Sequence, residues 1–260
     1  MKNRSIVAMA IIAVAGLAAN AMADGRIIIN DATGAYNGSD GSGGAFTISR
    51  HAGSPFANGD YNGTYGGNRI SGDGRGNTSF LSFCLERNEN IGFGGEYYTE
   101  IATSAAAGGL GGASGGVDPL SSTTQKLYRE FRNLADSNDA NVSTTGRFNG
   151  HLSNPLSLTG TDVTAIQNAI WFSEGELNSI SGAALLIYNW ANLGTTIVPG
   201  SEDVRVLRLW TNWNASSGYS GFAQDQLTLI PLPPAAWAGL GSLAGVAAFG
   251  MIRRRKLAAV

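Results

Sequence analysis

The chain has 260 residues, and its 17 basic and 19 acidic side chains give a formal net charge of −2. All 19 acidic residues lie between Asp24 and Ile230 with only 11 of the basic ones, so this portion carries −8. Such an acidic domain is unsuited to neutralising phosphates, which excludes nucleic-acid binding through a basic surface. Its length of about 200 residues suffices for one sizeable hydrophobic core or two small domains.

Residues 1–23 have the order of a secretory signal peptide. Lys2 and Arg4 precede an apolar run from Ile6 to Leu17, and the small residues at positions 21–23 come just before Asp24. A basic start, an apolar centre and a small-residue cleavage site are the three parts of such a signal. We therefore expect cleavage after Ala23 and export of the remaining chain.

The first half of the exported part is rich in glycine, at roughly one residue in four between Gly34 and Gly116, which is typical of turns and long loops. Short β-branched and aromatic runs interrupt it and predict strands at Arg26–Asn30, Ala45–Arg50, Ser79–Glu86 and Glu96–Thr103. The segment from Ala105 to Gly116 is almost entirely Ala, Gly and Ser. Its composition predicts a mobile loop or linker.

Cys84 is the only cysteine and lies in the exported part, so it cannot form an intrachain disulfide. Packing, intermolecular pairing and chemistry remain as its roles. In the predicted strand, period-two alternation puts Phe80, Ser82 and Cys84 on one face.

Helical spacing of apolar residues begins after Pro119 and predicts three helices, at about 121–136, 161–174 and 183–193. Asp162 favours the start of the second helix through the helix dipole. Strands return at Asp203–Trp210 and Gln226–Ile230. The order of strands, helices and strands predicts an α+β domain over residues 24–230, a mostly antiparallel β-rich domain with an inserted helical segment.

The last thirty residues form a separate unit. A proline segment at 231–234 is followed by the uncharged apolar run 235–252 and then by four cations at 253–256. Eighteen residues form a helix about 27 Å long, just enough to cross a thin bilayer core. The cations would stay on the cytoplasmic side. We therefore expect a single transmembrane helix projecting from the globular domain.

This tail, residues 231–256, resembles the PEP-CTERM sorting signal of Gram-negative bacteria, which a membrane protease-transpeptidase called exosortase processes in that family. The matching residues are Pro231, Pro233, Pro234, Arg253, Arg254 and Arg255. The family's central Glu is Leu232 here. The resemblance implies an exosortase-like processing partner, transient anchoring in the inner membrane, and then a place at the cell surface or in the extracellular matrix. A plain C-terminal membrane anchor is the alternative.

Two internal segments resemble the thioester domains of bacterial surface adhesins. In that family a Cys that follows an aromatic residue condenses with the Gln of a Gln-x-Ala-Ile-Trp helix and expels ammonia. The resemblance implies a cross-link between Cys84 and Gln167, supported by Phe83, Asn168, Ala169, Ile170 and Trp171. The Thr that often precedes the family's Gln is Ile166 here. Phe83 and Trp171 are expected to shield the bond from water.

Simpler explanations stay open for these residues. A free Cys is often only buried, and a helical Gln often only bonds backbone or water, so the same fold without the bond is an alternative. Glu174 and Glu176 are predicted to point to different faces and to be solvated. His51 and His151 are the only candidates for a histidine metal or catalytic role. Calcium binding is an alternative for the oxygen-rich residues Asp136, Asn138, Asp139 and Asn141, which lack the Gly and Glu of an EF-hand.

The sequence thus predicts a non-enzymatic, exported surface or matrix protein without cofactor or metal. The most specific form of this hypothesis is a thioester-dependent adhesin whose partner is a protein amine or a surface polysaccharide. The alternative is a non-covalent structural or glycan-associated matrix protein, in which aromatic residues stack on sugars; the candidates are Tyr61, Tyr65, Tyr97, Tyr98 and Trp213. A secreted hydrolase acting on polysaccharide is the third possibility.

Overall fold

The structure is a computed structural model that describes residues 25–32, 44–50, 79–113, 118–135, 147–152, 158–214 and 216–229. The predicted signal peptide, the transmembrane helix and the whole sorting tail lie outside the described residues. Within the described ranges, no helix is both long and apolar enough to span a bilayer.

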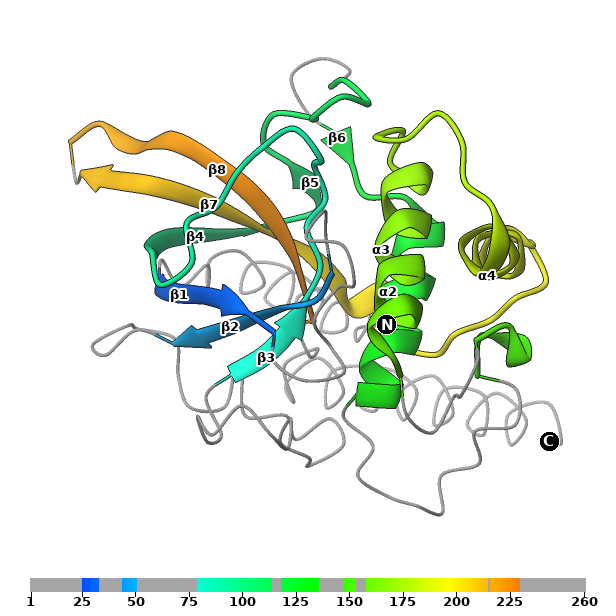
Figure 1. The fold of residues 1–260 in the computed structure, drawn as a ribbon. Helices are drawn as coiled ribbons and strands as arrows, with labels where there is room; N and C mark the ends of the chain where they lie inside the picture. Colours follow the sequence, from blue (N-terminus) through cyan, green and yellow to red (C-terminus); the bar gives the residue numbers. More distant parts are fainter. Residues whose placement is uncertain are drawn as a thin grey trace, which may run out of the picture.

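A six-stranded antiparallel sheet forms the larger part of the domain (Figure 1). Its order is β3-β2-β1-β4-β7-β8. The strands are β1 (Gly25–Asp31), β2 (Phe46–Arg50), β3 (Ser79–Ser82), β4 (Glu96–Ala102), β7 (Val204–Asn214) and β8 (Gly218–Leu229). The short strands β5 (Ser104–Ala105) and β6 (Asp118–Pro119) pair separately.

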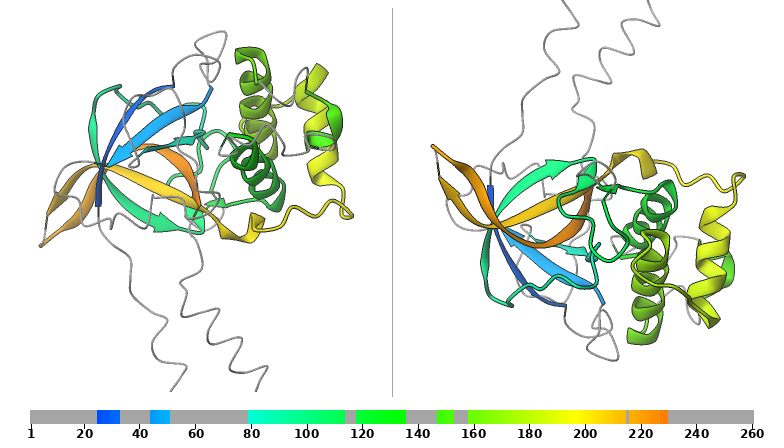
Figure 2. Two further views of the ribbon diagram at one scale, coloured as in Figure 1. Left: turned by 90° about the horizontal axis from the view of Figure 1, so that it is seen from below. Right: turned by 90° about the horizontal axis from the view of Figure 1, so that it is seen from above.

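The two edges of this sheet meet just after β3, so the sheet curls round on itself (Figure 2). Leu227 N donates to Phe83 O at 3.0 Å, and Leu85 N donates to Asp225 O at 3.0 Å. Between these bonds, Cys84 lies opposite Gln226 of β8. The strand predicted at Ser79–Glu86 is therefore shorter in the structure, where β3 ends at Ser82. Beyond Ser82 the chain no longer pairs with β2 and instead bonds to β8.

Three α-helices lie on one side of the curled sheet: α2 (Ser122–Ala135), α3 (Gly160–Ser173) and α4 (Gly182–Asn192). Each predicted helix is confirmed, with ends displaced by one residue. Two 3-10 turns accompany them in the chain: η2 (Arg147–Gly150) lies between α2 and α3, and η3 (Ser201–Asp203) follows α4. Thr159 begins α3 with a capping box, in which Asp162 N donates to the Thr159 hydroxyl and Thr159 N donates to the Asp162 carboxylate. The α+β prediction is confirmed, with the helices inserted between β6 and β7.

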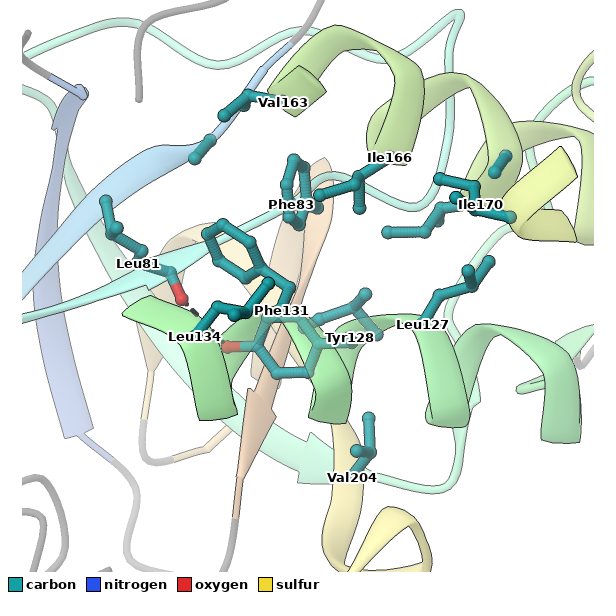
Figure 3. Close-up of a cluster of buried hydrophobic side chains, with 14 of the residues drawn as sticks. Leu81, Phe83, Leu127, Tyr128, Phe131, Leu134, Val163, Ile166, Ile170 and Val204 are labelled. Atoms are coloured by element: carbon teal, nitrogen blue, oxygen red, sulfur yellow. Dashed lines mark hydrogen bonds between the residues drawn. The ribbon is translucent and has the colours of Figure 1, made fainter. Parts of the chain in front are cut away.

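The domain has two apolar clusters, one on each face of the β3 segment. The helical cluster lies between the sheet and the helices (Figure 3); Phe83 contacts Phe131 edge-on at 4.6 Å, and Tyr128 OH donates to Leu81 O at 2.9 Å. The sheet cluster contains Phe80 and Cys84. The predicted alternation along this segment is therefore correct.

Candidate functional site

Helix α3 connects the two clusters because it is buried on two sides. Val163, Ile166 and Ile170 belong to the helical cluster, as Figure 3 shows. Trp171 belongs to the sheet cluster that contains Cys84. Gln167 lies one turn before Trp171, so the two side chains share a face of the helix. This face points towards the place where the sheet closes.

The side chains of Cys84 and Gln167 are in direct contact at this closure. Cys84 Sγ donates to Gln167 Oε1 at 3.3 Å, and Gln167 Nε2 donates to the backbone oxygen of Cys84 at 2.9 Å. Cys84 is 1 % exposed and Gln167 is 0 % exposed. The predicted juxtaposition of strand thiol and helix amide is thus present, although 83 positions separate the two residues.

The two hydrogen bonds are reciprocal, and together they fix the orientation of the Gln167 amide relative to the sulfur. A thiol that bonds the amide oxygen lies next to the amide carbon, which is the atom it would attack. Productive attack requires reacting atoms within about 3–3.5 Å and correct alignment. The sulfur lies 3.3 Å from the amide oxygen and therefore beside the amide group, and complete burial of both side chains excludes the water that would hydrolyse a thioester.

The Cys84 side chain is held as a neutral thiol. Burial raises its pKa well above the ordinary value, and the nearby charge of Glu86 adds to this rise. The indole of Trp171 is close enough to the thiol to oppose the rise. Because a thiolate is the better nucleophile, the proton must leave the sulfur as the new bond forms.

Two buried acids, Glu86 and Asp225, support the chain segment that follows Cys84. Asp225 N donates to Glu86 Oε2 at 3.0 Å, while Asp225 itself accepts from Ala106 N at 2.7 Å and Leu209 N at 3.0 Å. Burial raises the pKa of both carboxyls, and the neighbouring Asp225 raises that of Glu86 further. Sequence reasoning did not single out these acids. Glu86 is the last residue of the strand predicted at Ser79–Glu86, and Asp225 directly precedes the strand predicted at Gln226–Ile230; acids are rarely fully buried.

Glu176 is buried, so the prediction that it is solvated is wrong. Its carboxylate accepts from Arg87 N at 2.8 Å and from Gly111 N at 2.6 Å. A side chain at Gly109 would collide with this carboxylate, since an added Cβ would lie 2.3 Å from its oxygen. The glycine-rich segment predicted as a mobile loop or linker is thus hydrogen-bonded, in its described part, to the turn that follows α3.

The remaining motif residues serve packing. Phe83, Ala169 and Ile170 belong to the helical cluster, so Phe83 does not shield the thiol as expected; it points to the opposite face from Cys84. Trp171 does lie in the same cluster as Cys84.

The sequence suggested other sites, most of which fall outside the described residues: His51, Tyr61, Tyr65, Asp136, Asn138, Asp139 and Asn141. Within the described part of the chain, no three His, Cys, Asp or Glu side chains are grouped so that they could hold a metal ion.

Comparison of the chain with known proteins does not assign it to a family. No protein-family model matches it, and neither the curated proteins nor the solved structures gave a significant match.

Proposed function

We propose that this protein is a thioester-dependent surface adhesin, exported by residues 1–23 and sorted to the cell surface or extracellular matrix by residues 231–256 in the manner of PEP-CTERM proteins. The observation that supports the chemistry is the reciprocal, fully buried pair of hydrogen bonds between Cys84 and Gln167. An exosortase-like enzyme is the proposed partner for the tail.

The proposed first step is an acyl transfer within the chain. The Cys84 sulfur attacks the Gln167 amide carbon, a carbon–sulfur bond forms, and the carbon–nitrogen bond breaks. The amide nitrogen leaves as ammonia and carries the thiol proton with it. No electron is gained or lost, so the step needs no oxidant or cofactor.

In the second step the thioester donates its acyl group to a primary amine of another surface. The amine nitrogen forms an amide bond with the Gln167 carbon, and the sulfur leaves with the proton as the free Cys84 thiol. The product is a covalent link. The exported part contains one lysine, Lys126, whose Nζ donates to Ala191 O at 3.0 Å at the end of α4, and this bond restrains it from reacting with its own thioester.

Intact mass spectrometry of the purified protein tests the proposal directly. We expect a mass lower by one ammonia than the sequence requires, and a peptide map that joins the Cys84 and Gln167 peptides. The proposal is contradicted if protein extracted in its native state has the full sequence mass and its Cys84 reacts with an alkylating reagent. Deletion of 253–256 separately tests sorting, since we expect it to leave the tail uncleaved.

A second candidate function, a non-covalent glycan-associated matrix protein, is favoured by the β7–β8 hairpin. The hairpin projects beyond the sheet on the side away from the helices (Figure 1). Trp210 stacks on Tyr219 at 5.4 Å and contacts Phe222 at 4.5 Å, and Trp213 lies 6.3 Å from Tyr98. Trp213 is 43 % exposed and Phe222 56 % exposed. Residues 210–222 contain no charge, which suits a neutral sugar chain.

Alanine at Trp213 or Phe222 is expected to weaken binding to a neutral polysaccharide about tenfold, because each change removes a stacking surface. Affinity electrophoresis in gels containing soluble neutral or anionic polysaccharide measures this. Phe93→Ala is the matched control, since Phe93 is an exposed aromatic outside the hairpin. Equal retardation of all three variants would contradict a stacking role for the hairpin.

A further inference from the structure

Two buried polar atoms near Cys84 have no hydrogen-bond partner within the described part of the structure: Trp171 Nε1 and Gln226 Oε1. Trp171 is 4 % exposed and Gln226 is 0 % exposed. A buried polar atom without a partner costs free energy, so its retention calls for a physical reason. The indole N–H is a donor and the amide oxygen is an acceptor. Acyl transfer needs both: a donor for the oxygen that becomes negative, and an acceptor for the N–H of the leaving or attacking nitrogen.

We propose that Trp171 and Gln226 are the hydrogen-bond donor and acceptor for acyl transfer at the Cys84–Gln167 pair. The indole N–H of Trp171 stabilises the negative oxygen that forms on the Gln167 carbon, and the Gln226 carbonyl positions the nitrogen that leaves or attacks. This inference rests on the proposed thioester function and deepens it.

Trp171 is placed for this role by helix α3 and by the sheet cluster. It lies one turn after Gln167 on the same helix face and shares the cluster with Cys84. The Trp171 side chain is close enough to the thiol to lower the pKa of Cys84, which opposes the larger rise caused by burial. The indole ring is held from outside by Arg87, whose guanidinium carbon lies 6.0 Å from the ring centre.

The oxygen of Gln167 needs a new donor during the reaction. In the resting state it accepts from the Cys84 thiol. That bond is lost when the thiol proton departs with the nitrogen, at the moment when negative charge develops on the oxygen. The indole N–H of Trp171, which is buried beside the thiol, is then the donor that this oxygen recruits, as an oxyanion hole requires.

Gln226 is placed by the closure of the sheet. The hydrogen bonds on either side of the Cys84–Gln226 bridge run between Leu85 and Asp225 and between Leu227 and Phe83. Cys84 and Gln226 are therefore a non-hydrogen-bonded antiparallel pair, in which side chains lie closest together. The Gln226 oxygen can accept an N–H of departing ammonia or of the incoming amine beside the sulfur.

The test compares wild type, Trp171→Phe, Gln226→Met and the control Trp210→Phe. Trp210 is suitable because its Nε1 is also buried without a described partner, but it lies on the hairpin. The rate of methylamine addition to the purified protein is followed by intact mass over a range of amine concentrations. Thermal unfolding of each variant reports folding.

We expect Trp171→Phe to lower the maximal rate about 100-fold, the usual effect of removing one oxyanion donor. Gln226→Met is expected to raise the half-saturating amine concentration about tenfold with a smaller effect on the maximal rate. Trp210→Phe should react as wild type does. A purely structural role of Trp171 would lower thermal stability without changing the reaction rate of the folded protein.

A folded Trp171→Phe variant that reacts within about threefold of wild type overturns the inference while leaving the thioester intact. A wild-type protein that never loses ammonia overturns both proposals. If Trp171→Phe does not fold, the indole is replaced by benzothiophene through incorporation of benzothienylalanine, which keeps the ring shape and removes only the N–H. The same 100-fold loss is then expected, and wild-type rates overturn the donor role.

Discussion

Cys84→Ala is expected to abolish methylamine addition to Gln167. Without the sulfur no acyl donor forms, and a glutamine amide does not exchange with amines on its own at a useful rate. The variant should have the full sequence mass, with Gln167 present as an ordinary glutamine. Intact mass and peptide mapping after methylamine treatment measure both results.

The same change should cost little stability, about 1 kcal/mol, because it removes one small buried atom and only a weak S–H donor to Gln167 Oε1. The bond from Gln167 Nε2 to the backbone oxygen of residue 84 stays in place. Gln167→Ala should cost more, since it leaves that buried carbonyl unpaired at about 1–3 kcal/mol. Ser49→Ala is the matched control; Ser49 is a small buried residue of β2 whose hydroxyl has no described partner. Methylamine addition to Cys84→Ala at Gln167 would rule out the thioester.

The domain is expected to lose stability as the pH rises from about 5 towards 9, because of the buried acid Glu86. Burial, and then Asp225, raise the pKa of Glu86 from 4.5 to about 9. Between these two values the folded state holds a proton that the unfolded state has released, so raising the pH favours unfolding. The stabilising proton is fully present below the unfolded pKa and lost as the pH passes the folded pKa. Asp225, raised by burial to about 7, acts in the same direction.

Glu86→Gln should flatten this dependence, since an amide cannot ionise, and should stabilise the domain at pH 8 by an amount on the order of a few kcal/mol. Urea unfolding at a series of pH values measures the slope. Glu96→Gln is the control, because Glu96 is an exposed partner of Arg26 at 3.2 Å. A wild-type stability that increases between pH 5 and 8 would show that Glu86 is ionised in the folded domain.

Residues with a strong local signal were predicted well from the sequence. The helices follow from apolar spacing, and α3 also from the acidic Asp162 in its first turn, because such signals act within one or two turns. The strand β8 was predicted only at Gln226–Ile230, whereas it begins at Gly218. Its first half is uncharged, largely exposed and contains two glycines, so no local pattern marks it as a strand. Pairing with β7 across the hairpin decides it.

The sequence by itself determined the α+β class, the three helices, the alternation that separates Phe80 and Cys84 from Phe83, and the candidate pair Cys84 and Gln167. Only the tertiary structure decided that the sheet closes at Cys84, that Gln226 becomes its neighbour, and that Glu86 and Glu176 are buried. The physical reason is the sequence distance over which each kind of interaction acts. Propensity and periodicity act over a few neighbouring residues, but closure of the sheet joins segments 142 positions apart, and whether a carboxylate meets water or backbone N–H groups depends on which distant segments pack over it.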